Sequence, residues 1–154
     1  MRVSRAVVSI IVGLFLARPV FAQKSGSRPV IWHDRGNISA LDLVNGSGGK
    51  NHKPGTKFKF IKESSSGTSP KFEVEDEHGA KWKVKLGPEV KSETAATRLI
   101  WAVGYFVDDD YYQPQIHVHG LIPLSRGQEF VSGDTVKDVR LERTSLTVSP
   151  DTNS

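Results

Sequence analysis

Three short runs between residues 57 and 86 alternate apolar and polar side chains, and this alternation constrains the fold more than any other feature of the sequence. The apolar positions of the three runs are Phe58 and Phe60, Phe72 and Val74, and Trp82, Val84 and Leu86. Residues 63–70 and 77–79 separate the runs and contain the Ser, Gly and Pro residues that are common in turns. A period of two is typical of strands with one buried face. The pattern therefore predicts an antiparallel meander of three strands with one apolar face.

A change of period after Gly87 and Pro88 predicts a helix. Ser92 is a typical N-cap residue, and Glu93 follows where the helix dipole favours an anion. The apolar positions at helical spacing are Ala95, Ala96, Leu99, Ile100, Val103 and Phe106. We expect one amphipathic helix of about four turns, with this face packed on the apolar face of the meander. The acidic run 108–110 is expected to end the helix in solvent.

Further strands are predicted at residues 115–119 and 136–143, where apolar and polar side chains alternate again. The expected fold class is α+β, an antiparallel β-meander of about five strands with one amphipathic helix packed on it, over residues 57–143. Residues 23–56 are rich in Gly and Pro and are expected to be flexible, with a solvent loop at 46–50. Residues 144–154 are expected to be a disordered tail.

The N-terminus has the order of a secretory signal peptide. Arg2 and Arg5 precede the uncharged run 6–17, and a small residue, Ala22, ends the segment. The run is shorter than the roughly 20 residues that a spanning helix needs. We therefore expect residues 1–22 to be cleaved, which predicts a secreted or periplasmic protein without a transmembrane anchor; the alternative is an uncleaved N-terminal anchor.

Charge and cysteine content exclude several functions. The chain has a formal net charge of +4, but residues 1–22 contain three arginines and no acid, so the remainder carries only +1. This balance does not favour binding to a nucleic-acid backbone, and no nucleic-acid partner is expected. The absence of cysteine excludes disulfides, thiolate metal sites and cysteine nucleophiles.

Three consecutive motifs carry a resemblance to known proteins. They are WKVKLG at residues 82–87, ETAATRL at 93–99 and WAVGY at 101–105. The stretch from about Lys57 to Gly120 resembles a group of uncharacterised exported bacterial proteins with these motifs. The order of strand, Ser/Gly turn, strand, lysine-bearing strand and glutamate-bearing helix also resembles the small N-terminal lobe of protein-kinase-like folds, in particular the phosphatidylinositol-kinase branch.

The resemblance to a kinase-like small lobe implies a nucleotide site. Backbone N–H groups of Ser66, Gly67 and Thr68 would cover the phosphates, and a lysine of the third strand would neutralise them. Lys85 is the expected lysine, with Lys83 as the alternative on the same face, and Glu93 is the expected ion-pair partner. The simpler interpretation is that these lysines form a solvated strand face and that Glu93 is only a helix-start acid.

Catalysis by this sequence alone is not expected. A kinase-like enzyme needs an Asp base and Asp or Asn ligands for magnesium, but residues 121–154 contain no H-R-D-like or D-F-G-like string. No catalytic residue is therefore assigned. The leading hypothesis is a non-catalytic binding module or the truncated remnant of a kinase-like protein. The alternative is a nucleotide-dependent phosphotransferase lobe that another chain completes.

Two further groups of residues allow a different ligand. His117 and His119 lie two apart in a predicted strand, so both imidazoles share one face, as in some metal sites. Tyr111 and Tyr112 follow the acidic run and are expected to be exposed, where they could contact a sugar. Either group would suit a metal- or carbohydrate-binding periplasmic protein, while two exposed histidines are the simpler interpretation. The sequence identifies no particular cofactor or partner.

Overall fold

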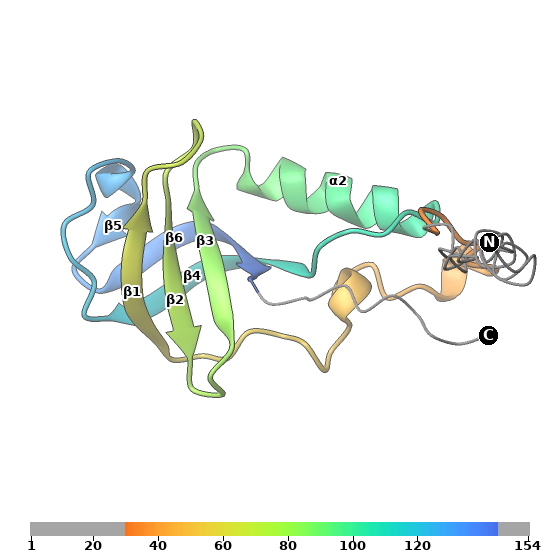
Figure 1. The fold of residues 1–154 in the computed structure, drawn as a ribbon, viewed down its shortest axis with the longest axis horizontal. Coiled ribbons are helices and arrows are strands. Elements are labelled where there is room, and N and C mark those ends of the chain that lie inside the picture. Colours follow the sequence, from red (N-terminus) through yellow and green to blue (C-terminus); the bar gives the residue numbers. More distant parts are fainter. Residues whose placement is uncertain (1–29, 145–154) are drawn as a thin grey trace, which may run out of the picture.

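The computed structural model describes residues 30–144, which contain one α-helix and a sheet (Figure 1). The predicted signal peptide and residues 145–154 of the predicted tail lie outside the described residues. The strands are β1 (Phe58–Ser64), β2 (Lys71–Asp76), β3 (Lys81–Leu86), β4 (Asp110–His119), β5 (Val131–Ser132) and β6 (Thr135–Arg143), and the helix is α2 (Val90–Ala102). Short 3-10 turns lie at Ile38–Ala40, Gly46–Gly48 and Gln128–Phe130. The α+β fold class predicted from the sequence is confirmed.

The sheet closes on itself as a barrel. Strands β1, β2 and β3 form the predicted antiparallel meander, in which Val74 pairs with both Phe60 and Trp82. Strand β6 then pairs antiparallel with both β3 and β4, and Phe58 of β1 pairs in parallel with Val118 of β4. The two edges of the meander are therefore both covered by later strands.

Side chains of the strands fill the inside of the barrel. Apart from Val90 of the helix, the most deeply buried apolar side chains come from β2, β3, β4 and β6: Phe72, Val74, Trp82, Val84, Leu86, Val118, Val136, Val139 and Leu141. The Trp82 indole N–H donates to Asp76 Oδ2 at 2.8 Å, so the one polar atom of this ring is satisfied. The period-two positions of the sequence are thus the core, as predicted.

Helix α2 does not lie on the apolar face of the meander, and this prediction is wrong. Strands β4 and β6 already cover that face, so α2 lies along the outside of the barrel and extends past it (Figure 1). The helix also begins earlier than predicted. Its N-cap residue is Glu89, and Ser92 is inside the first turn, where its hydroxyl donates to the Glu89 carbonyl.

The buried face of α2 is the reverse of the predicted one. Its buried residues recur every four positions and are Val90, Thr94, Arg98 and Ala102. The residues expected to face inward are instead exposed: Ala95, Ala96, Leu99, Ile100, Val103 and Phe106. The surface beneath the helix explains this reversal. The outer faces of β3 and β6 carry Lys85, Arg140 and Glu142, so the helix packs on them through polar rather than apolar side chains.

The acidic run and the residues after it are also more buried than predicted. Asp109 and Asp110 are buried, and Tyr111 next to them is buried as well. Strand β4 begins at Asp110 rather than at residue 115. Pro114 lies within the strand, where its neighbours Gln113 and Gln115 pair with β6, and the residue of β6 between their partners is Asp138, which has a left-handed φ of 48°. The predictions that the acidic run lies in solvent and that Tyr111 is exposed are therefore both wrong.

The glycine-rich segment before the barrel packs against it. A Cβ atom on Gly46 would collide with the guanidinium of Arg98, and one on Gly48 would collide with the Tyr111 hydroxyl. Both glycines are buried, so residues 46–48 are not a solvent loop. Glycine is needed here because the chain passes directly over large side chains.

Candidate functional site

The end of β3 and the start of α2 bring Lys85 and Glu93 together. Lys85 Nζ lies 2.5 Å from Glu93 Oε1 and 3.7 Å from Glu89 Oε1. Gly87, with a φ of 134°, makes the short turn that places the first helical turn over the strand it has just left. The pairing that the resemblance implies for Lys85 and Glu93 is therefore present in the structure.

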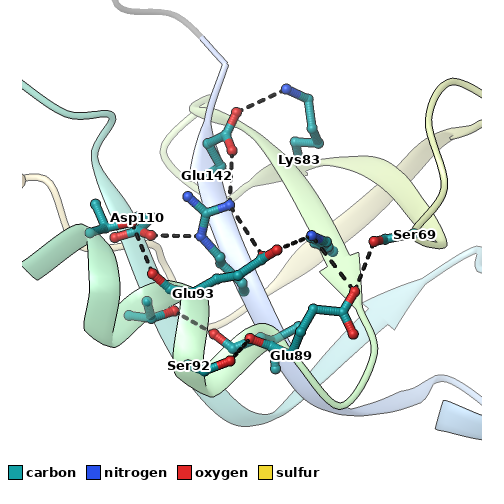
Figure 2. A network of polar contacts seen from close by, with 12 residues as sticks. Ser69, Lys83, Glu89, Ser92, Glu93, Asp110 and Glu142 are labelled. Atoms are coloured by element: carbon teal, nitrogen blue, oxygen red, sulfur yellow. Dashed lines mark hydrogen bonds and ion pairs between the residues drawn. The ribbon is translucent and has the colours of Figure 1, made fainter.

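Lys83 has a different partner, although it lies on the same face of β3. Its Nζ atom is 2.9 Å from Glu142 Oε1 of β6 (Figure 2). The other carboxylate oxygen of Glu142 is 3.2 Å from Arg140 Nη1. Lys83 thus belongs to the β3–β6 surface, and Lys85 is the lysine that faces the helix.

A buried ion-pair network continues from this point beneath α2. The carboxylate of Asp110, which is fully buried, lies 2.5 Å from Arg98 Nη1 and 2.6 Å from Arg140 Nε. Arg98 also donates to the Asp110 carbonyl. Arg140 Nη1 lies 3.8 Å from Glu93 Oε2, which joins the network to the Lys85 pair (Figure 2). Sequence reasoning missed this network, although Arg98 is the one charged residue in the run 94–107.

The Ser/Gly turn between β1 and β2 lies at the same end of the barrel as the start of α2 (Figure 1). The Ser69 hydroxyl donates to Glu89 Oε1 at 2.8 Å, and this hydrogen bond lowers the pKa of the Glu89 carboxyl. The carbonyls of Gly67 and Thr68 accept from Arg126, at 3.0 and 3.2 Å. The turn is thus fixed on both sides, to α2 through Ser69 and to Arg126.

The predicted phosphate donors of this turn are solvent-exposed. Ser66, Gly67 and Thr68 are exposed, and the hydrogen bonds of the described residues include none donated by their backbone N–H groups to protein. Gly67 has a φ of 74°, a conformation that suits glycine. These N–H groups are therefore available to an external acceptor.

The predicted metal ligands are not joined by a third ligand. His117 and His119 are exposed on the outer face of β4, and His117 Nδ1 is 3.6 Å from Asp134 Oδ1. Within residues 30–144, no three His, Cys, Asp or Glu side chains are grouped so that they could hold a metal ion.

A cavity of about 490 Å³ lies on the side of α2 away from Lys85, and Tyr111 and Tyr112 both line it. The Tyr111 hydroxyl donates to the Gly49 carbonyl at 2.9 Å, and burial raises the pKa of Tyr111 to about 12. The Tyr112 hydroxyl donates to Asp138 Oδ1 at 2.6 Å. Other lining residues include Asn45, Lys53, Lys91 and Gln113, and the lining contains no carboxylate.

No protein-family model, curated protein or solved structure matches this chain. Among residues 30–144, the helix is not long and apolar enough to cross a membrane.

Proposed function

We propose that this chain is an exported, non-catalytic module that binds the phosphates of a nucleotide at Lys85. The observation that carries the proposal is the position of Lys85. Its ammonium is held by Glu93 and Glu89 at the end of the barrel where the Ser/Gly turn presents unpaired N–H groups. A fixed cation at the same end of the barrel as exposed N–H donors, linked to their turn through Glu89 and Ser69, suits phosphate oxygens.

The acidic neighbours determine how the ligand binds. Glu89 and Glu93 orient the flexible side chain of Lys85, but they also bring two negative charges close to any phosphate. We therefore expect the nucleotide to bind as its magnesium complex, because the divalent cation offsets the phosphate charge. The chain itself supplies Lys85 and the N–H groups of residues 66–68.

The module is proposed as non-catalytic because the carboxylates near the helix are already engaged. Asp110 accepts from two arginines, and Asp109 Oδ2 lies 2.8 Å from His52 Nδ1. Neither is available as a base or as a magnesium ligand without breaking these contacts. Phosphoryl transfer would need catalytic groups from another polypeptide.

Thermal unfolding with and without Mg-ATP tests the proposal. Saturating Mg-ATP is expected to raise the melting temperature of the protein by several degrees. The variant Lys85→Ala should lose this rise, whereas Lys83→Ala, which removes a lysine from the same strand face, should keep it. An absent rise in the wild-type protein, or an equal rise in Lys85→Ala, would overturn the proposal.

A second candidate is a carbohydrate site in the cavity beside Tyr112. Its volume is in the range of ligand sites, and its lining combines the Tyr112 ring, with Lys91 Nζ 5.3 Å from the ring centroid, and the amide of Gln113. Calorimetric titration with neutral mono- and disaccharides should give a binding signal that Tyr112→Ala abolishes and Lys85→Ala retains. No signal with any sugar would exclude this candidate.

A further inference from the structure

The outer end of α2 and the segment before the barrel expose an unusual number of large apolar side chains. We call them the outer apolar patch. Its members are Val30, Ile31, Trp32, Leu99, Ile100, Val103, Tyr105 and Phe106, which are 48–71% exposed. Single exposed apolar residues are ordinary, but a contiguous group of this size is typical of an interaction surface.

The patch is contiguous because residues 32–33 lie against residues 103–106. Trp32 and Tyr105 form an antiparallel bridge, and the Trp32 indole N–H donates to the Val103 carbonyl at 2.5 Å. The ring centroids of His33 and Phe106 are 5.5 Å apart. These contacts fix the extended segment beside the last turn of α2, so the two parts present one surface.

The location of the patch separates it from the proposed nucleotide site. Lys85 contacts the first turn of α2, whereas the patch begins at Leu99 and continues past the end of the helix, away from the barrel (Figure 1). A partner on the patch can therefore bind while the Lys85 site is open.

The area of the patch fits one side of a stable protein interface. Aromatic and large aliphatic side chains that are about half exposed each present on the order of 100 Å². Eight of them therefore present roughly 800 Å², which is about what each partner buries in an interface of standard size. Its aromatic content is also typical of such interfaces.

The charge of this surface favours self-association. In a symmetric dimer identical patches face each other, so a charged patch would repel itself. In the helix part of the patch, residues 94–107 contain one charged side chain, Arg98, and it is buried against Asp110. In the segment before the barrel, the Arg35 guanidinium is half-buried over the Trp101 ring and is held by the Trp101 and Tyr105 carbonyls. From these observations we propose that a second copy of this chain covers the outer apolar patch, forming a two-fold symmetric dimer.

Sedimentation velocity of the full chain, from below 1 μM to about 100 μM, tests the dimer. The wild-type protein should sediment with twice its monomer mass at the higher concentrations. Ile100→Glu and Leu99→Glu should each weaken the dimer at least tenfold, because each places a carboxylate opposite its own copy. Ile122→Glu is the matched control, since Ile122 is 52% exposed and Ile100 is 48% exposed, but Ile122 lies outside the patch. Near-ultraviolet circular dichroism should show that all three variants are folded.

Three results would overturn the proposal. The first is a wild-type protein that stays monomeric throughout the concentration range, which would mean that something other than a second copy covers the patch. The second is an equal loss of association in Ile122→Glu. The third is association only in molecules whose intact mass shows that residues 1–22 are retained, because the apolar run 6–17 would then be the cause.

Discussion

The inside of the barrel and the surface beneath α2 are both buried, but they are built from opposite kinds of side chains. The barrel interior is apolar, and residues such as Val84 and Leu86 come from positions that alternate along the strands. The surface beneath α2 is a network of ions that joins Arg98 and Arg140 to Asp110. The comparison teaches that the apolar side chains of a helix identify its buried face only when the surface beneath it is apolar too.

The closed barrel explains why the two regions differ. Once β6 pairs with both β3 and β4, the apolar faces of the central strands point inward and mostly polar side chains remain outside. A helix that packs on such a surface has to present polar and charged side chains to it, because a buried charge without a partner is strongly destabilising. Its own apolar residues are then left facing solvent, where a partner can bury them.

The largest expected effect is at the ion-pair network. Asp110→Ala leaves the buried Arg98 without a carboxylate, although Arg140 keeps Glu142, and breaking a buried pair in this way costs about 4 kcal/mol. Urea unfolding measures this loss. The matched control is Lys62→Met, which removes the exposed pair between Lys62 and Glu73 and should change stability by less than about 0.5 kcal/mol. Equal effects of the two substitutions would show that α2 is not held by the network.

A smaller loss of stability is expected when apolar residues are truncated to alanine, and its size should differ between the barrel and the helix. Leu86→Ala should destabilise the protein by about 3 kcal/mol, because it creates a cavity in a fully buried site. Leu99→Ala should change stability by less than about 0.5 kcal/mol when unfolding is measured on dilute, monomeric protein. A cost at Leu99 similar to that at Leu86 would place Leu99 in the core and contradict the orientation of α2.

The smallest effect depends on pH and concerns the contact between the barrel and the segment before it. Glu77 accepts from the backbone N–H groups of Thr56 and Lys57 at 2.9 and 3.0 Å, and these bonds lower its pKa from 4.5 to about 2. Because the folded pKa is depressed, the carboxylate stabilises the protein above about pH 4.5, and this contribution is lost as the pH falls towards 2.

The melting temperatures of the wild-type protein and Glu77→Gln, measured from pH 7 to 2, report this contribution. The wild-type protein should be the more stable of the two at neutral pH, and the difference should disappear as the pH approaches 2. A difference that is independent of pH would show that the charge of Glu77 does not hold residues 56 and 57.

The strands could be predicted because their alternation is local, whereas the Lys85–Glu93 pair is expected only from the resemblance to a kinase-like small lobe. Alternation from Phe58 to Leu86 marks the meander, and Lys85 is only eight positions from Glu93. Closure of the barrel depends on β6 pairing with β3 across more than 50 residues, and nothing local encodes that pairing. The orientation of α2 follows from closure, so it could not be read from the helix alone.

One signal in the sequence does indicate the buried face of α2. Val90, Thr94, Arg98 and Ala102 recur every four positions, and Arg98 is the single charge among residues 94–107. A buried arginine almost always has an ion-pair partner, and the acidic run 108–110 that follows supplies candidates. This stripe together with Asp110 predicts the ion-pair network beneath α2. The apolar residues of the helix alone predict that its opposite face is buried.

Thiol reactivity tests the orientation of α2 most directly, because the chain contains no cysteine. Thr94 and Ala95 are adjacent, and the structure buries the first and exposes the second. In Ala95→Cys the thiol should react with a disulfide reagent at nearly the rate of an unfolded chain. In Thr94→Cys it should react on the order of 100-fold more slowly, because reaction requires local opening. Faster reaction at position 94 than at position 95 would contradict a helix that docks through its polar face.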